Sequence, residues 1–191
     1  MRIQTFFGLA LLALSGLLPA HESKTIALRA ETIHRVSGPA ISQGVVLVRA
    51  GKIVAVGAAT DVEIPAGAEV LEAKVLTPGF VDARGTAGLA GLYNRNQDQE
   101  QHDKSAPLQP ELRAIDAYNF REALVTWLRE YGVTTLNAGH APRAVISGQS
   151  SILKTRAAPM EETALRSFGM VLASLGDGAR GSGGKAPGTK A

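Results

Sequence analysis

The sequence predicts an α/β fold in which a small β unit is followed by alternating strands and helices. From Thr25 to Ala73, apolar and polar residues alternate with the period of half-exposed strands. Between residues 75 and 136, an apolar strand, an amphipathic helix and a second strand follow one another. This order is typical of a βαβ unit, in which the two strands run parallel.

Composition narrows the class of protein. The chain has 191 residues, of which 45% are hydrophobic, so it can bury the core of one domain or of two small ones. The formal net charge is only +3, and no dense stripe of Lys and Arg with interleaved aromatics is present, so nucleic acid is not an expected partner. The absence of cysteine excludes disulfides, thiolate metal sites and a cysteine nucleophile.

Residues 1–20 have the layout of a secretory signal peptide. Arg2 supplies a positive start, an apolar run of 13 residues extends from Phe6 to Leu18, and Ala20 provides a small residue for cleavage. The run is shorter than a membrane span, so no stable membrane anchor is expected, although an uncleaved anchor is the alternative. We expect export to the periplasm or beyond, after cleavage near Ala20.

Residues 21–75 predict an N-terminal β subdomain. Two β-branched runs, Val45–Val48 and Ile53–Val56, are separated by the turn-like Arg49-Ala50-Gly51-Lys52, which predicts a hairpin. A further short strand is expected at Glu69–Glu72. This unit is expected to be antiparallel, and it is too small to bury much surface alone.

The next segment, residues 76–175, predicts βα units. The apolar run Val75–Ala83, bent at Pro78-Gly79, is predicted as a strand buried on both faces. The polar stretch from Asn94 to Lys104 indicates a solvated loop, with a substrate-facing role as the alternative.

The clearest helix is predicted after Asn119, which is a good N-cap residue, with Glu122 completing a capping box. Its apolar residues share one face, and Gly132 ends it; they are Phe120, Ala123, Leu124, Trp127, Leu128 and Tyr131. Val133–Leu136 then predicts a strand.

The remaining elements are less regular. Ala144–Leu153 predicts a short strand or a hairpin broken at Gly148, and Glu161–Leu175 predicts a helix. Residues 176–191 form a Gly- and Lys-rich tail that cannot support a core and is expected to be flexible.

The stretch Leu76-Thr77-Pro78-Gly79-Phe80-Val81-Asp82-Ala83, placed after a β unit, resembles the N-terminal part of the amidohydrolase superfamily, in particular its imidazolonepropionase-like branch. The similarity continues more loosely through Gln109–Ala117, Gly132–Thr135 and Ser147–Gln149. It implies a partial (β/α)8 TIM-type barrel, preceded by a small antiparallel β-sandwich segment. It also implies a hydrolase that uses a divalent, zinc-type metal to act on non-peptide carbon–nitrogen bonds of a small molecule.

The chain departs from the family pattern at the metal site. In the family, Asp-Ala is followed by His-x-His, whose two imidazoles bind the metal, but here Arg84 and Thr86 hold those positions. A guanidinium has no lone pair to offer, and a threonine alone is a poor zinc ligand. No metal or other cofactor is therefore expected for this chain.

Length predicts that the barrel is incomplete. A (β/α)8 barrel takes about 250 residues, so this chain holds about two to three βα units after its β subdomain. We expect a truncated protein, with a missing C-terminal portion or a second copy as its partner. The alternative is that the isolated chain does not fold stably, because its strand edge is unpaired.

Four residues are candidates for a site. Asp82 and His140 would lie at the catalytic ends of strands, with a turn-capping role and a loop role as the respective alternatives. Arg84 and Gln149 are candidates for substrate binding, and Arg84 would favour anionic ligands. His102 lies among Asp98, Glu100 and Asp103, where solvated charge is favoured over a metal cluster.

Two functions remain open. One is an exported amidohydrolase-related hydrolase, inactive as this chain alone. The other is a non-catalytic binding or scaffolding relative that kept the fold and lost the metal, which the Arg84-Gly85-Thr86 sequence favours.

Overall fold

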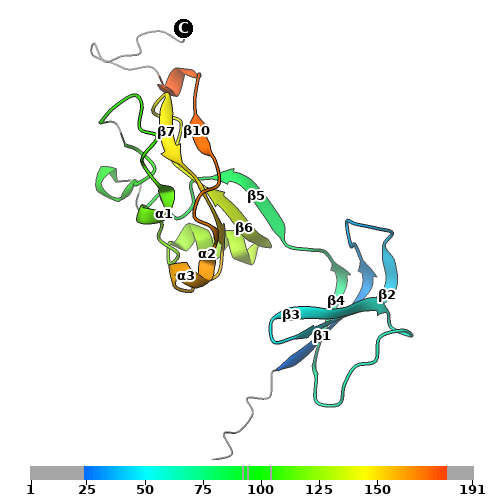
Figure 1. The fold of residues 1–191 in the computed structure, drawn as a ribbon. Helices are drawn as coiled ribbons and strands as arrows, with labels where there is room; N and C mark the ends of the chain where they lie inside the picture. Colours follow the sequence, from blue (N-terminus) through cyan, green and yellow to red (C-terminus); the bar gives the residue numbers. More distant parts are fainter. Residues whose placement is uncertain (1–23, 92, 94, 104, 180–191) are drawn as a thin grey trace, which may run out of the picture. The chain divides into compact units, whose positions relative to one another are not determined.

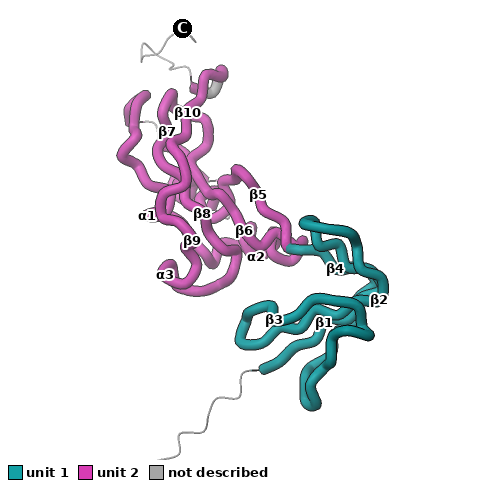
Figure 2. The backbone as a smooth tube through the Cα atoms, turned by 45° about the vertical axis from the view of Figure 1, so that its right-hand side comes forward, with its two compact units in different colours: residues 1–78 teal, residues 79–191 magenta. Residues whose placement is uncertain are grey.

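The computed structural model describes residues 24–91, 93, 95–103 and 105–179. The chain forms two compact units, one ending at Pro78 and the other beginning at Gly79 (Figures 1 and 2). The predicted signal peptide and most of the predicted tail lie outside the described residues. Within the described part, no helix has the length and apolar character needed to span a membrane.

The first unit is one four-stranded sheet, ordered β3-β2-β1-β4. Its strands are β1 (Thr25–Ile33), β2 (Ile41–Arg49), β3 (Lys52–Ala58) and β4 (Glu69–Leu76). The predicted hairpin is confirmed, since β2 and β3 pair antiparallel. Ala50 and Gly51 both have positive φ angles, 50° and 72°, which characterise the type I′ turn that suits the twist of a hairpin.

The prediction that this unit is antiparallel is wrong for one of its three strand pairs. After the hairpin, the chain returns to the free side of β1, where β4 runs parallel to it. The described residues form a single sheet rather than two packed ones, and each face carries its own small apolar cluster. One cluster contains Ala27, Val45 and Leu47, and the other Ala30, Ile33 and Val46.

The second unit begins with the predicted βαβ arrangement. The strands β5 (Phe80–Gly85) and β6 (Val133–Ala138) pair parallel, and the helix α2 (Ala123–Glu130) lies between them in sequence. Its buried core includes residues from β6, from α2, from the segment between β5 and α2, and from the later strand that contains Leu153: Ala87, Leu89, Ala114, Tyr118, Val125, Leu136, Ala138 and Leu153.

The parallel pattern does not continue beyond β6. The chain next forms the short strand β7 (Ile146–Gln149) instead of a crossover helix, so β8 (Ser151–Lys154) returns antiparallel to β6. The sheet has the order β5-β6-β8-β9 and is open in the described residues, not closed into a barrel. The expectation of two to three βα units is therefore wrong beyond the first.

The predicted helix at Glu161–Leu175 is also wrong. Only α3 (Met160–Thr163) is helical, and the chain then forms β9 (Ala164–Arg166) and β10 (Val171–Ala173). These strands pair with β8 and β7, so tertiary pairing overrides a helical pattern that Gly169 already weakens. The remaining short elements are η1 (Asn96–Asp98), α1 (Ala114–Ala117) and η2 (Asp177–Ala179).

Two further predictions need correction. The run Val75–Ala83 is not one strand buried on both faces, because it is split between β4 and β5, and Phe80 and Val81 are 63% and 66% exposed. The helix begins at Ala123 rather than next to Asn119, and no side chain caps it. Asn119 Oδ1 instead accepts the Arg121 N–H.

Candidate functional site

The carboxyl ends of β5 and β6 meet at one edge of the sheet, because the two strands are parallel. Beyond the ladder, Asn137 Nδ2 donates to the Ala83 carbonyl at 3.0 Å, and the Gly139 N–H donates to the Gly85 carbonyl at 3.0 Å. In open α/β sheets, ligands bind at this end of the strands. The residues at the ends of β5 and β6 are therefore the candidates for a site.

Three of the four predicted site residues are linked by direct hydrogen bonds. Arg84 Nη2 donates to the His140 carbonyl at 3.3 Å, so the guanidinium joins the ends of the two strands. Asp82 Oδ1 accepts the Arg84 N–H at 3.0 Å within β5, where the pairing of β5 with β6 shifts in register. The Gln149 side-chain Nε2 instead donates to the Pro110 carbonyl at 2.9 Å.

The residues at the strand end do not fit the metal pair of the amidohydrolase pattern. The Arg84 side chain is a permanent cation without a lone pair, and Thr86 offers only a hydroxyl. The part of the chain that the structure describes holds no group of three His, Cys, Asp or Glu residues placed to bind an ion. No chemical step is therefore derived through a metal at this position.

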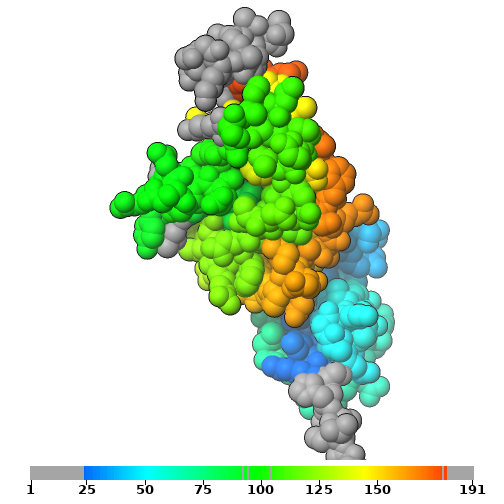
Figure 3. All heavy atoms as spheres, turned by 60° about the vertical axis from the view of Figure 1, so that its left-hand side comes forward, coloured from blue at the N-terminus to red at the C-terminus, as the bar shows by residue number. Residues whose placement is uncertain are grey.

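The long polar segment after β5 is held against the strand ends. The Ala141 N–H donates to the Gln101 carbonyl at 3.0 Å, the Gln109 N–H to the Ile146 carbonyl at 2.9 Å, and the Gln149 N–H to the Leu112 carbonyl at 2.7 Å. In Figure 3 this segment, drawn in green, covers much of one face of the second unit. Polar residues of this segment line a pocket together with His140, which follows β6.

One pocket, of about 390 Å³, has His140 in its wall together with residues of the polar segment. His140 is only 6% exposed, and its Nδ1 has no hydrogen-bond partner among the residues that the structure describes. Burial lowers the pKa of His140, while the negative charges of Asp103 and Glu100 partly oppose that shift. The imidazole is therefore neutral at pH 7, and a neutral ring nitrogen can accept a hydrogen bond.

Asp103 is held in place by its neighbours. Ser105 donates to Asp103 Oδ1 through its N–H, at 2.7 Å, and through its hydroxyl. The bond from the Ser105 hydroxyl lowers the pKa of Asp103 most, and the bond from the Ser105 N–H lowers it next. Gln109 and His140 make smaller contributions in the same direction. Asp103 is therefore a carboxylate at neutral pH, and it faces the pocket that His140 also lines.

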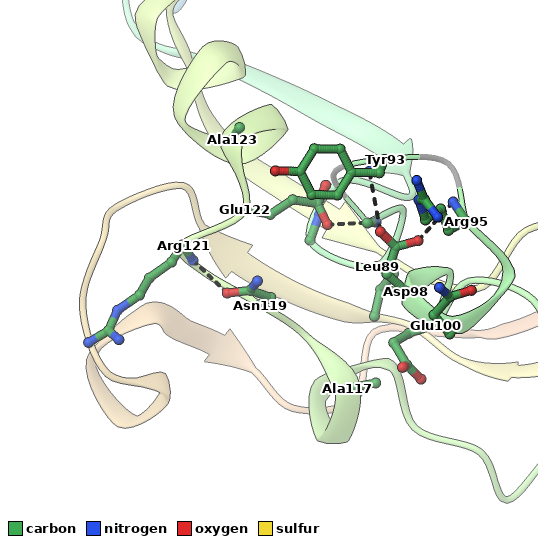
Figure 4. A pocket seen from close by; sticks show the side chains of 13 residues that line it. Leu89, Tyr93, Arg95, Asp98, Glu100, Ala117, Asn119, Arg121, Glu122 and Ala123 are labelled. Atoms are coloured by element: carbon green, nitrogen blue, oxygen red, sulfur yellow. Dashed lines mark hydrogen bonds between the residues drawn. The ribbon is translucent and has the colours of Figure 1, made fainter.

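A larger pocket, of about 740 Å³, lies between the start of α2 and the segment after β5 (Figure 4). Its deepest polar residue is Glu122, which is 5% exposed and whose two oxygens accept the N–H groups of Gly88 and Gly91 at 3.0 and 3.1 Å. The sequence indicated Glu122 only as part of a capping box. Nothing in its local pattern indicated that the carboxylate would bind a loop more than 30 residues away.

Tyr118 packs beside this pocket against Gly88. Burial, and to a smaller extent the negative charge of Glu122, raises the pKa of Tyr118 to about 12. The phenol therefore keeps its proton at physiological pH and cannot serve as a base there. Its hydroxyl has no hydrogen-bond partner within the described residues.

Comparison with known proteins identifies a fold but no close relative. No protein-family model and no curated protein matches the chain. An amidohydrolase from Thermotoga maritima MSB8 superimposes with a TM-score of 0.72 and 24% identity, over 81% of this chain and 40% of that one.

Two other solved structures are less similar. The N-acetyl-D-glucosamine-6-phosphate deacetylase of Mycobacterium smegmatis matches 60% of this chain and 24% of its own at 25% identity, with a TM-score of 0.36. The Aspergillus niger ochratoxinase matches 39% of this chain and 18% of its own at 18% identity, with a TM-score of 0.33. The fold likeness thus rests on the Thermotoga protein, an amidohydrolase of which this chain spans 40% of the length.

Proposed function

We propose that the chain is a member of the amidohydrolase superfamily and forms the N-terminal part of an exported hydrolase acting on non-peptide carbon–nitrogen bonds of a small molecule. The observation that carries the proposal is the likeness to the Thermotoga amidohydrolase over 81% of the chain. The motif Leu76–Ala83 supports it, because these residues connect β4 to β5 and lead to the candidate site. The same motif supports the imidazolonepropionase-like branch.

The described residues would contribute the scaffold and ligand contacts of such an enzyme. Arg84 and Thr86 do not suit a metal, so any metal ligands would have to come from sequence beyond these strands. The role of Arg84 would be to join the strand ends through the His140 carbonyl and to face an acidic group of the substrate.

The test begins with the transcript downstream of the Ala191 codon, followed by expression of the protein it encodes. That protein is expected to release amine or ammonia from at least one member of a panel of amides, cyclic amides and amidines. An encoded sequence with no His or Asp at later strand ends, together with no release from any substrate, would exclude the hydrolase. Sequencing the N-terminus of the exported protein tests cleavage after Ala20.

A second candidate is a binding protein that keeps the fold without the chemistry, and the guanidinium at the strand end favours it. Arg84 is exposed, and the paired N–H donors of its guanidinium suit the two oxygens of a carboxylate. A panel of mono- and dicarboxylates would be titrated against the wild type and Arg84→Ala, with Arg49→Ala in the first unit as the control. This candidate fails if Arg84→Ala changes the binding of no acid.

A further inference from the structure

Among the described residues that line it, the pocket beside His140 has more carboxylates than cationic side chains. Four carboxylates line it: Glu100, Asp103, Glu111 and Asp116. The cationic residue among its lining residues is Arg113, and it pairs with Asp116 at 3.5 Å. Within the described chain, none of the other three carboxylates has a lysine or arginine at ion-pair distance.

A second observation, independent of charge, also points to a ligand. His140 lines the pocket and is 94% buried, and no hydrogen-bond partner for its Nδ1 is found in the described part of the chain. A methyl group on Gly148 would come within 3.1 Å of that nitrogen and 2.6 Å of the Leu112 carbonyl oxygen, so glycine keeps this corner open. Buried polar atoms are rarely left unpaired, and a donor from a ligand would pair this one.

The pocket suits an organic cation better than a metal ion. Its volume of about 390 Å³ lies within the range of small-molecule sites. Its carboxylates attract positive charge, and a neutral imidazole accepts an N–H bond. The described residues include no group of three His, Cys, Asp or Glu side chains placed to hold a metal ion.

We propose that this pocket binds the ammonium or guanidinium group of a small organic cation, with Glu100 and Asp103 supplying the charge and His140 accepting an N–H. The assignment concerns binding alone, so it stands apart from the hydrolase proposal. An absence of hydrolysis with saturable cation binding would leave this inference intact, and hydrolysis without cation binding would remove it.

The test is a titration of the whole chain with agmatine, followed by isothermal calorimetry and by the backbone amide signals of Gly148 and Glu100. Saturable binding is expected, with shifts confined to the pocket and an affinity that falls with added salt. The neutral analogue 1-butanol is expected not to bind. Equal binding of agmatine and 1-butanol would overturn the proposal, and so would amide shifts spread over the whole surface. Neither result requires a variant.

Variants then test the residues. Glu100→Gln combined with Asp103→Asn is expected to weaken agmatine binding about tenfold or more, because two nearby carboxylate charges are lost. His140→Phe is expected to weaken it without removing the salt dependence. Glu130→Gln, an exposed carboxylate on α2 outside the pocket, should bind as the wild type does. An unchanged affinity in the folded double variant would contradict the assignment.

Discussion

Glu122 holds the start of the segment after β5 against α2. It is buried, and it is the acceptor for two backbone N–H groups. Glu122→Ala is expected to lower the free energy of unfolding by about 2–4 kcal/mol, since one buried and one partly buried N–H lose their acceptor. Denaturant unfolding followed by Trp127 fluorescence measures this, and Glu130→Ala, at an exposed position, should change it by less than about 0.5 kcal/mol. Equal effects of the two substitutions would contradict the role of Glu122.

Gly148 is required by its backbone and by its surroundings. Its φ of 114° is disfavoured for other residues, and a methyl group there would crowd Leu112 and His140. Gly148→Ala is expected to cost about 1–3 kcal/mol of stability. Chemical denaturation measures the loss, and Gly176→Ala serves as the control, since that position is open and its φ is not positive. A wild-type midpoint for Gly148→Ala would show that the strand end is looser than described.

The buried His140 makes stability depend on pH. Its pKa is lowered from 6.5 by burial, so below pH 6.5 the unfolded chain takes up the proton first and folding weakens. Asp103, whose pKa is lowered from 3.8, adds stability that is lost only at more acid pH. His140→Gln is therefore expected to flatten the stability profile just below pH 6.5. An unchanged slope there would show that the imidazole is not shielded.

Among the structural elements, the β2–β3 hairpin offers a direct test of turn chemistry. Ala50 adopts a φ of 50°, a conformation that asparagine tolerates better than alanine, and Gly51 follows it. Ala50→Asn is expected to stabilise the first unit by about 0.5 kcal/mol, because substitutions that suit the native backbone conformation typically stabilise a protein by about that amount. Hydrogen exchange of the β2 and β3 amides measures this, with Ala50→Val expected to speed exchange. Slower exchange in the valine variant would refute the turn assignment.

The hairpin and the β5–α2–β6 unit could be predicted from sequence because their patterns are local. Turn residues and a period of two indicate a hairpin, and an apolar stripe that ends in Gly132 indicates a helix. The start of α2 was misplaced because the Glu122 side chain contacts a distant loop instead of capping the helix. The strands β9 and β10 were missed because they depend on pairing with β8 and β7, which local periodicity does not encode.

The candidate site, too, could be predicted only in part from the sequence. The ends of β5 and β6 were expected to carry Arg84 and His140, because carboxyl ends of parallel strands meet. Their contact through the His140 carbonyl could not be read from residue types. The pocket that His140 lines could not be predicted either. It forms only because the polar segment after β5 folds back onto β6, through backbone hydrogen bonds such as that from the Ala141 N–H to the Gln101 carbonyl.

For the whole molecule, the open sheet of the second unit bears on stability. The strand β5 ends the sheet order, and Phe80, Val81, Trp127 and Tyr131 are all more than half exposed. An unpaired edge with apolar side chains favours association. The isolated chain is expected to melt broadly and to associate as its concentration rises, as measured by calorimetry and sedimentation. A sharp, concentration-independent melt of a monomer would contradict this.

The chain combines a fold similar to that of an amidohydrolase with a β5 strand end whose residues do not suit a metal. Elemental analysis of purified residues 21–191 after dialysis tests this most directly. Because Arg84 and Thr86 stand where the imidazole pair would be, we predict no stoichiometric zinc or other transition metal. Near-stoichiometric metal would contradict the claim and would point to a replacement centre formed by His102, His140 and the neighbouring carboxylates.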